Sequence, residues 1–304
     1  MRTLVTGGAG FLGHAFAVRA RGAGHQVTTV DLDGDADVRC DVTDVPALAA
    51  AMAKVGPQVV VHLAALLTDA AAEDPVAAVR LNIGGTAAVF AAARAAAVQR
   101  IVYASSIAAV GPCADDSGDD VALRPLTVYG ATKAAGEHLC RALSAVDGYP
   151  ASVALRFGWV YGPGRERGWR VAQEVIERFA RGDRQVVVPD FRGAIDWTYV
   201  DDAAEVLLRA LAAPPTRFAA LNVVGDRRTM RDAIAHLQLR HPGVRVEYQS
   251  VAVPASGWTL RNDRLEAALG FAPSTRLEEG IDAMLAAWRP DRVQRKPSSA
   301  GRAG

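Results

Sequence analysis

The chain has 304 residues, half of them apolar, and its 34 Lys and Arg nearly balance 33 Asp and Glu, which gives a formal net charge of +1. This balance argues against the strongly charged surface of a nucleic-acid-binding or membrane-bound protein, so we expect neither partner. A chain of this length can bury a full core, in one large domain or in two closely joined ones.

The three cysteines, at positions 40, 113 and 140, form no CxxC or metal-binding spacing. A sparse, odd set is typical of reduced thiols, so we predict a cytoplasmic protein without a metal site. The chain starts directly on a strand pattern, from which we expect no signal peptide. The alanine-rich stretch 84–98 carries Arg94 and is too short to span a bilayer, which indicates a buried helix.

Short runs of Val, Ile and Leu alternate with alanine-rich stretches along the first half of the chain. The expected strands lie near residues 2–6, 26–31, 58–63, 100–105 and 152–157. The expected helices lie near residues 11–22, 44–54, 73–97, 129–147 and 168–181. Alternation of this kind predicts βαβ units, and hence an α/β fold with a Rossmann-type, doubly wound parallel sheet.

Beyond about residue 165 the pattern becomes shorter and mixed, with helix-like runs near 201–212, 229–240 and 276–288. We predict a dinucleotide-binding domain over 1–165 that also carries the catalytic residues. Residues 166–289 are expected to form mainly a smaller, mixed α/β substrate-binding lobe, whose segments can interleave with the first domain. The basic tail 290–304 is expected to be disordered.

The most informative local signal is the turn Thr6-Gly7-Gly8-Ala9-Gly10-Phe11-Leu12-Gly13, which follows a strand and opens a helix. It matches GxGxxG through Gly8, Gly10 and Gly13, and GxxGxxG when Gly7 is taken as the first glycine. Glycines permit the tight turn and let backbone N–H groups approach a pyrophosphate at the helix N-terminus. The turn therefore predicts a bound dinucleotide.

Asp31 ends the second expected strand, where a carboxylate can accept both adenosine ribose hydroxyls and would repel a 2′-phosphate. The nearest following arginine is Arg39, so NAD is favoured over NADP. Asp41 and Val42 follow the next short strand and are candidates for the adenine edge. A helix N-cap or turn role for this pair remains equally open.

Tyr129 and Lys133 are four residues apart, so they lie one helical turn from each other on the same face. A lysine ammonium beside a phenol stabilises the phenolate, and we expect it to lower the tyrosine pKa from its usual value of about 10. Such a group can give and take a proton in alcohol–ketone chemistry. The pair alone occurs on many ordinary helices, so the rest of the chain decides its meaning.

Ordered motifs over residues 1–285 resemble the extended short-chain dehydrogenase/reductases, in their NAD-dependent epimerase/dehydratase group. The motifs are TGGAGFLG at 6–13, the acid at 31, HLAA at 62–65, LNIGGT at 81–86, YASSIAAVG at 103–111, YGATK at 129–133, LRFGWVYGPG at 155–164 and DWTYVDDAAEVLL at 196–208. Several motifs in order at the family's spacings are more specific than any one of them.

The resemblance implies that Ser106 positions the substrate oxygen, Tyr129 takes the proton as a hydride passes to the nicotinamide, and Lys133 bonds the nicotinamide ribose. Ser105 is adjacent to Ser106, but alignment to Gly111 favours Ser106 for this role. The physical roles agree with this, because ligands bind at the carboxyl ends of parallel strands.

The resemblance also assigns a second set of residues to the cofactor. Phe11 and Leu12 belong to the glycine turn, and Phe157 follows Arg156 at the strand end that borders the nicotinamide. Asn82 matches a helix asparagine near the active site. It can equally be a buried asparagine bonded to backbone, and both readings can hold together. The segment whose backbone runs beside the cofactor is Leu63-Ala64-Ala65.

The chain departs from its family where dehydratases carry an acidic pair, because Ile107 and Ala108 follow the serine. Sugar dehydration is therefore disfavoured, unless one of four nearby acids folds back to the site. We expect these acids to lie in a solvated loop. They are Asp115, Asp116, Asp119 and Asp120.

Two further departures affect the substrate. Trp159 stands where enzymes of nucleotide sugars commonly have asparagine, and Ile195 stands where they tend to carry arginine. A UDP-sugar is thereby put in doubt. Trp159 either shapes the pocket or packs in the core. Arginines that could replace the missing phosphate ligands are Arg165, Arg167, Arg170 and Arg192, of which we take Arg165 and Arg192 as substrate candidates.

These residues predict an enzyme that transfers a hydride between NAD and a secondary alcohol carbon of a small sugar or sugar-like substrate. One hypothesis is an epimerase with a transient ketone; the alternative is a net dehydrogenase or ketoreductase on a non-nucleotide hydroxy substrate. A non-catalytic NAD sensor is a third class, against which the retained tyrosine and lysine argue. By resemblance we expect a homodimer formed by the helices near 73–97 and 129–147.

Overall fold

The computed structural model describes residues 1–168, 170–190, 193–213, 216–250 and 259–288. Its main sheet has seven strands in the order β10-β6-β5-β4-β1-β2-β3, and every neighbouring pair is parallel. The strands are β1 (Arg2–Thr6), β2 (Gln26–Asp31), β3 (Val38–Arg39), β4 (Val59–His62), β5 (Arg100–Ser106), β6 (Ala151–Phe157) and β10 (Phe218–Val223). The predicted doubly wound parallel sheet is confirmed.

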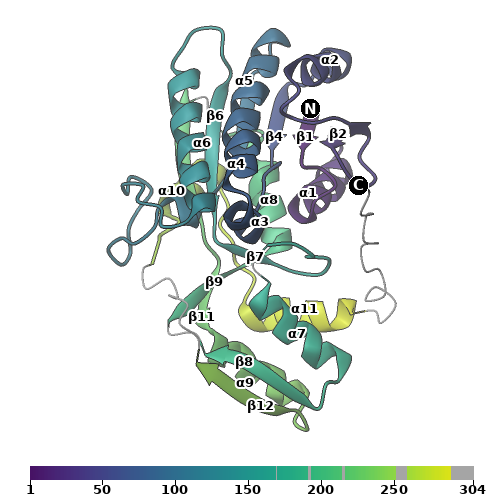
Figure 1. The fold of residues 1–304 in the computed structure, drawn as a ribbon, viewed down its shortest axis with the longest axis vertical. Helices are drawn as coiled ribbons and strands as arrows, with labels where there is room; N and C mark the ends of the chain where they lie inside the picture. Colours follow the sequence, from purple (N-terminus) through teal and green to yellow (C-terminus); the bar gives the residue numbers. More distant parts are fainter. Residues whose placement is uncertain (169, 191–192, 214–215, 251–258, 289–304) are drawn as a thin grey trace, which may run out of the picture.

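Helices cover both faces of this sheet (Figure 1). Because successive strand residues point to opposite faces, Leu4 packs in one hydrophobic cluster and Val5 in the other. Helices α1 (Phe11–Gly22) and α8 (Val200–Ala210) pack together against the face of Val5. The face of Leu4 is covered by α2 (Val45–Val55), α5 (Gly85–Ala95) and α6 (Val128–Ser144).

The single helix expected near 73–97 is divided. It comprises α3 (Thr68–Glu73), α4 (Pro75–Ala78), a π-helical turn η1 (Val79–Gly84) and α5. The break falls at Asp74, whose side chain accepts the Ala77 N–H and so caps a new helix at Pro75.

The run Pro75–Ala95 has 21 residues and, in the part of the chain that the structure describes, is the one helix long and apolar enough to cross a membrane by length and composition. The expectation of a segment too short to span a bilayer was made for the stretch 84–98, and most of that stretch belongs to this longer run. Its burial is confirmed, because Val89 and Phe90 are completely buried and half of the run's most apolar window lies inside the protein.

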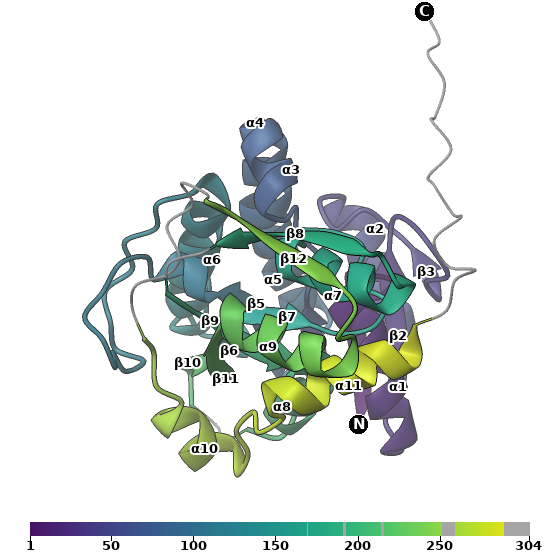
Figure 2. The ribbon, with the colours of Figure 1, turned by 90° about the horizontal axis from the view of Figure 1, so that it is seen from below.

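A smaller group of strands and helices lies below the main sheet in Figure 1 and is seen from beneath in Figure 2. We call this group the second layer. A three-stranded sheet has the order β11-β9-β7, and a separate pair is β12-β8. These strands are β7 (Trp159–Tyr161), β8 (Gln185–Asp190), β9 (Ala194–Tyr199), β11 (Asp226–Thr229) and β12 (Arg245–Ser250). The helices of the second layer are α7 (Val171–Arg181), α9 (Met230–Arg240) and α11 (Leu277–Ala287), while α10 (Asp263–Leu269) packs against β10 and α8 beside the main sheet.

The chain passes between the two layers more than once. After β7, α7, β8 and β9 it returns to the main sheet with α8 and β10, and then leaves it again for β11. The two layers therefore share interleaved segments, while the domain ranges given above remain predictions. The tail 290–304 lies outside the described residues.

Candidate active site

Ser106 and Tyr129 meet because β5 and α6 come into backbone contact. β5 ends at Ser106, and a short 3-10 turn η2 (Ile107–Ala109) follows. α6 begins after Thr127, whose side chain accepts the Gly130 N–H at 3.0 Å and caps the helix. A Cβ on Gly130 would overlap the carbonyl oxygen of Ala108, so only glycine permits this approach. The first turn of α6 therefore lies directly against the end of β5.

The structure distinguishes the two adjacent serines. The Ser105 hydroxyl is buried and donates to Glu137 Oε1 at 2.5 Å. Glu137 lies two helical turns beyond Tyr129 on α6. Ser106 is partly exposed, its oxygen accepts the Ala108 N–H at 3.2 Å, and its hydroxyl lies near enough to Tyr129 to lower the pKa of the phenol. Of the two hydroxyls, that of Ser106 therefore lies beside Tyr129, and its role toward a substrate stays a prediction.

Lys133 is buried beneath Tyr129, and its Nζ donates to the Ala104 carbonyl oxygen at 2.7 Å. Nζ lies 5.7 Å from the centre of the Tyr129 ring and 5.1 Å from that of Tyr103. Burial lowers the pKa of Lys133 to about 8, although the neighbouring Cys140 and Glu137 act in the opposite direction. An ammonium with a pKa in this range can respond to charges placed beside it near neutral pH.

We expected Lys133 to lower the pKa of Tyr129, and this expectation is wrong. Burial raises the pKa of Tyr129 to about 12, while the Ser106 hydrogen bond and the Arg165 charge lower it by smaller amounts. Lys133 is turned toward the strand carbonyl, so loss of hydration outweighs its effect on the phenol. The resting form of Tyr129 at neutral pH is therefore the protonated phenol.

The glycine turn lies backbone against backbone on the segment after β4. Gly7 has φ +70°, and an added Cβ there would lie 2.6 Å from the Ala64 nitrogen. A Cβ on Gly13 would overlap the carbonyl oxygen of Gly7, which closes the turn onto α1. Leu63, Ala64 and Ala65 are partly exposed beside this turn.

The N-terminus of α1 fits a phosphate ligand. Gly10 makes no side-chain cap, and the described first turn contains no acidic residue. Its first N–H groups are therefore left for an external acceptor, as a pyrophosphate requires. Phe11 and Leu12 are partly buried and pack on the hydrophobic cluster below, which fixes this end of the helix.

Asp31 borders the same turn from the end of β2. Its Oδ2 accepts the Ala9 N–H at 3.1 Å and its Oδ1 accepts the Leu32 N–H at 2.8 Å, so the carboxylate is held in place. Asp41 has the turn role left open above, because its Oδ1 accepts the N–H and hydroxyl of Thr43 at 2.8 Å each. The neighbouring Val42 is buried.

Asn82 lies in the π-helical turn and bridges two parts of the site. Its Oδ1 accepts the Leu66 N–H at 2.8 Å, and its Nδ2 donates to the Leu66 carbonyl at 3.0 Å and to Thr132 Oγ1 at 2.9 Å. The buried amide therefore ties the segment beside the cofactor to the residue before Lys133. Its role in the described chain is that of the backbone-bonded asparagine.

A buried ion pair behind the site was missed in the sequence. Arg156 Nη2 lies 2.8 Å from Glu137 Oε2, and both side chains are 3% exposed. Glu137 follows Lys133 by one helical turn, so the sequence could place Glu137 beside Lys133, but no local spacing links Glu137 to Arg156. Arg156 thus points to α6, while the next residue, Phe157, pairs in register with Ser106 and is buried in the core.

The expected solvated loop is partly a buried one. Asp119 is 5% exposed, and its Oδ1 accepts the Asn222 N–H at 2.5 Å. Ser117 pairs with the segment 259–261 through two backbone hydrogen bonds, from its own N–H at 3.0 Å and from the Arg261 N–H at 3.1 Å. For Asp119 the expectation is therefore wrong, because the loop packs against β10 at the edge of the main sheet.

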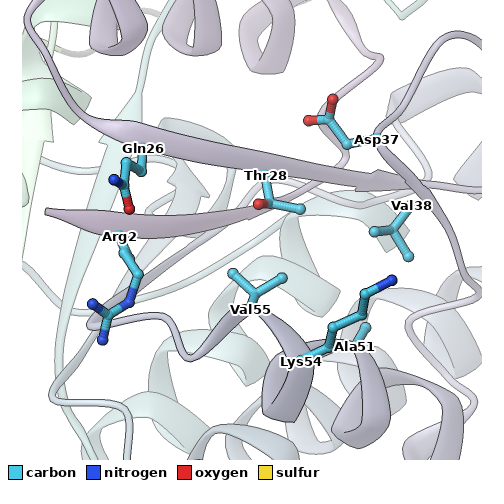
Figure 3. Close-up of a pocket in the computed structure, with 8 residues that line it drawn as sticks. All are labelled: Arg2, Gln26, Thr28, Asp37, Val38, Ala51, Lys54 and Val55. Carbon is cyan, nitrogen blue, oxygen red and sulfur yellow. The ribbon is translucent and has the colours of Figure 1, made fainter.

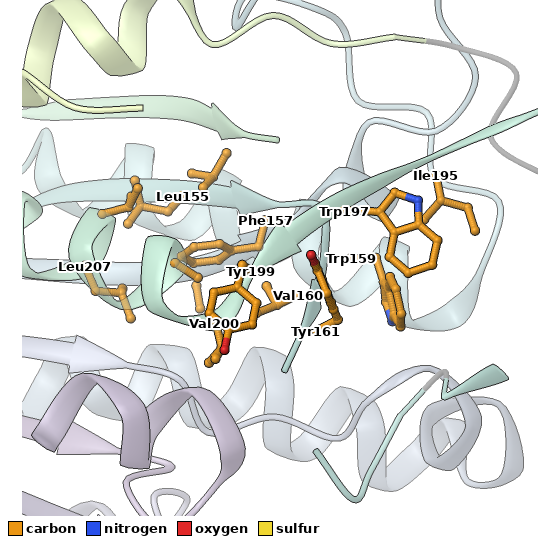
Figure 4. Close-up of a cluster of buried hydrophobic side chains, with 14 of the residues drawn as sticks. Leu155, Phe157, Trp159, Val160, Tyr161, Ile195, Trp197, Tyr199, Val200 and Leu207 are labelled. Carbon is orange, nitrogen blue, oxygen red and sulfur yellow. The ribbon is translucent and has the colours of Figure 1, made fainter. Parts of the chain in front are cut away.

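Trp159 is packed among other aromatic rings (Figure 4). Its ring stacks on Tyr161 with centroids 5.5 Å apart and meets Trp197 edge to face at 4.8 Å. With 9% of its surface exposed, the indole serves mainly the core. The aromatic positions that follow β6 therefore stabilise the junction of the two layers.

The structure separates the candidate arginines. Arg170 is paired with Glu177 at 2.7 Å, and Arg167 is 81% exposed with Asp33 at 3.9 Å. Arg165 alone is placed by Trp159, with its guanidinium carbon 5.7 Å from that ring centre, and its charge acts on Tyr129. Arg192 lies outside the described residues.

A pocket of about 390 Å³ lies away from these groups (Figure 3). It is lined by Arg2 and Gln26 at the amino ends of β1 and β2, and by Lys54 and Val55 at the end of α2. Ligands of doubly wound sheets bind at the carboxyl ends, so this pocket is not part of the candidate site.

Comparison with known proteins agrees with this geometry. The profile of the "NAD dependent epimerase/dehydratase family" matches residues 3–223. A UDP-glucose 4-epimerase from Mycolicibacterium smegmatis is 30% identical over 92% of this chain and 96% of its own, and a 3-diazoavenalumate denitrifying reductase from a Streptomyces species is 31% identical over 90% and 96%.

Among solved structures, MoeE5 in complex with UDP-glucuronic acid and NAD superposes with a TM-score of 0.84. The two chains are 27% identical, and the superposition covers 94% of this chain and 98% of MoeE5. The chain belongs to the NAD-dependent epimerase/dehydratase family, within the extended short-chain dehydrogenase/reductases.

Proposed function

We propose that the protein transfers a hydride between NAD and a secondary alcohol carbon of a sugar or sugar-like substrate, as an epimerase that passes through a transient ketone. The observation that carries this proposal is the meeting of Ser106, Tyr129 and Lys133 at the carboxyl end of β5. The sugar epimerases among its relatives support it.

Each residue has a separate task in this scheme. Bound NAD supplies the hydride acceptor and donor. Ser106 holds the substrate oxygen by a hydrogen bond, and Tyr129 exchanges the proton of that oxygen. The charge of Arg165 favours the phenolate of Tyr129, and Lys133, buried one helical turn below, would bond the nicotinamide ribose. Since the pKa of Tyr129 is about 12, the resting phenol is ready to protonate a ketone oxygen.

We propose NAD in preference to NADP because of the carboxylate of Asp31. It is fixed at the end of β2 by two backbone N–H groups, beside the glycine turn. A 2′-phosphate placed there would meet a fixed negative charge, whereas ribose hydroxyls would find an acceptor.

A net dehydrogenase or ketoreductase is the second candidate. It uses the same residues but releases a ketone or alcohol together with the changed cofactor. The protonated resting phenol favours reduction of a ketone, and the positions of Trp159 and Ile195 do not offer the asparagine and arginine usual for nucleotide sugars. Reductases among the relatives support this reading as well.

The test is absorbance at 340 nm with purified protein, NAD and a panel of nucleotide sugars, free sugars and hydroxy acids. An epimerase interconverts a substrate with its epimer without net NADH. A dehydrogenase forms NADH in proportion to substrate consumed, which would contradict the epimerase proposal. Binding of NAD with no turnover on any compound, in either direction, would contradict both and leave the sensor hypothesis.

We also propose a cytoplasmic homodimer formed through the helices within 73–97 and 129–147. Three large apolar side chains near these helices are strongly exposed in the single chain, namely Val76, Val79 and Leu126. A partner surface would remove them from water. Light scattering after size exclusion should give twice the mass of the chain, and Val76→Glu should reduce it to one copy. A wild-type monomer would contradict the proposal.

A further inference from the structure

Behind the proton-transfer site, the Glu137 carboxylate is hydrogen-bonded to two residues. It accepts the Ser105 hydroxyl at 2.5 Å and three hydrogen bonds from Arg156 at 2.8 to 3.1 Å. Glu137 also lies one helical turn beyond Lys133, and both side chains are buried. The charge of Glu137 raises the pKa of Lys133, because little water separates two buried groups.

Arg156 extends this contact to other elements. Its Nη1 donates to the Asp119 carbonyl at 2.8 Å and approaches Asn222 Oδ1 at 3.5 Å. Asn222 in turn donates to the Arg261 carbonyl at 3.2 Å. Arg156 therefore connects α6 to the loop at Asp119 and to β10. Through Asn222 of β10 it is linked to the segment 259–261.

The surroundings of Lys133 identify Glu137 as its one acidic neighbour among the described residues. On α6 it is faced by Tyr129, Glu137 and Cys140, and burial raises the pKa of the Tyr129 phenol and of the Cys140 thiol, so both stay protonated at neutral pH. The aromatic ring of Tyr103 faces it from β5. From β4 it is faced by His62, which burial holds neutral.

The contact with Ser105 has a second consequence. At the end of β5 two hydroxyls are adjacent, and one of them is occupied by Glu137. Ser106 is then left as the hydroxyl beside Tyr129. Glu137 therefore affects both neighbours of Tyr129. It acts on Lys133 through its charge and on Ser106 by binding the adjacent Ser105.

We propose that Glu137, held by Arg156, is a positioning residue of the proton-transfer site, which keeps Lys133 charged and Ser105 out of the cleft. Through Arg156 it also couples the site to the loop at Asp119 and to the segment 259–261. This inference rests on the proposed function. Neither residue touches substrate in this arrangement; both act through Lys133 and the serines.

Removal of Glu137 alone would leave Arg156 buried without a partner, and such a variant can fail to fold. The test therefore uses the double variant Glu137→Gln/Arg156→Met, which removes both charges. Asn222→Ala is a milder variant, which leaves the Arg156–Glu137 pair in place and removes the connection from Arg156 through Asn222 to the Arg261 carbonyl. Glu73→Gln, at an exposed glutamate in α3, is the matched control.

The readout is the pKa of Lys133, measured by ¹³C NMR of the lysine Cε signals during a pH titration of the full chain. The chain contains three lysines, Lys54, Lys133 and Lys296, so the Lys133 signal can be assigned with one Lys133→Arg variant. In the wild type we expect a pKa of about 8. In the double variant it should fall, because Glu137 is among the groups that raise the pKa of Lys133 and Arg156 is not among the groups that act on it.

An unchanged Lys133 pKa in a folded double variant would overturn the proposal and reduce the ion pair to a structural role. Activity gives the second readout: kcat should fall by about tenfold or more and its high-pH limb should move to lower pH, while NAD affinity stays within about threefold. Since the NMR titration needs no turnover, a protein that fails every activity assay would refute the proposed function and still decide this inference.

Discussion

The cofactor side and the proton-transfer side of the cleft are built differently. Around the glycine turn, backbone meets backbone: Gly7 approaches Ala64, and Gly13 closes on Gly7. At β5 and α6, side chains do the positioning, through the bonds of Lys133 to Ala104 and of Glu137 to Arg156. Backbone contact depends on local glycines, whereas the second side depends on charges brought together from several elements.

The largest effect should follow from a side chain added to the cofactor side. Gly13→Ala places a methyl group on the carbonyl oxygen of Gly7, which must move and distort the turn. We expect NAD affinity to fall by more than about 100-fold, or about 3 kcal/mol, as measured by titration with NADH fluorescence. Gly22→Ala at the end of the same helix meets no described atom within 4 Å and is the control. Equal affinity in both variants would remove the distinction between the two sides.

On the proton-transfer side, adjacent residues of one strand should differ. Ser106→Ala should lower kcat by about 100-fold, in line with the loss of one positioned hydrogen bond to the reacting oxygen. Ser105→Ala removes only the bond to Glu137 and should change kcat by less than about fivefold. Steady-state kinetics with the substrate found in the panel checks this. The reverse order would exchange the roles of the two serines.

These two sides also mark how far the sequence could be read. The glycine turn, Asp31, Tyr129 and Lys133 are encoded in short spacings, and the five expected strands of the first half are all present. The Arg156 and Glu137 pair, the burial of Asp119 and the packing of Trp159 depend on contacts between distant segments. The raised pKa of Tyr129 depends on burial, which the helical spacing alone does not report.

A third prediction concerns acid stability at the strand between the two sides. His62 is bonded by Thr6 at 2.7 Å and Thr86 at 3.1 Å, and burial lowers its pKa to about 3. The unfolded chain takes up a proton below pH 6.5 while the folded protein keeps the ring neutral, so stability falls as pH falls from 6.5 toward 3. We expect a loss of about 2–3 kcal/mol between pH 6 and 4 from this residue.

Urea unfolding at several pH values measures that contribution. His62→Gln should flatten the difference between pH 6 and 4 by the stated amount, whereas exposed His14→Gln should leave it as in the wild type. An identical pH dependence in wild type and His62→Gln would show that the folded protein accommodates the charged ring.

The smallest effect is expected for cofactor choice. Asp31→Ser removes the fixed carboxylate but keeps a short polar side chain beside the Ala9 and Leu32 N–H groups. NAD should bind about tenfold more weakly, and the preference for NAD over NADP should shrink by a similar factor. Binding titrations with both cofactors check this, and an unchanged preference would place the ribose away from Asp31.

The most direct test of the central claim is Tyr129→Phe, measured for NAD affinity and turnover on the same preparation. The proton path predicts an affinity within about threefold of wild type and a kcat lower by about 1,000-fold or more, because only the phenolic oxygen is removed. Full turnover in Tyr129→Phe would contradict the assignment of the proton to Tyr129 and with it the account of this site.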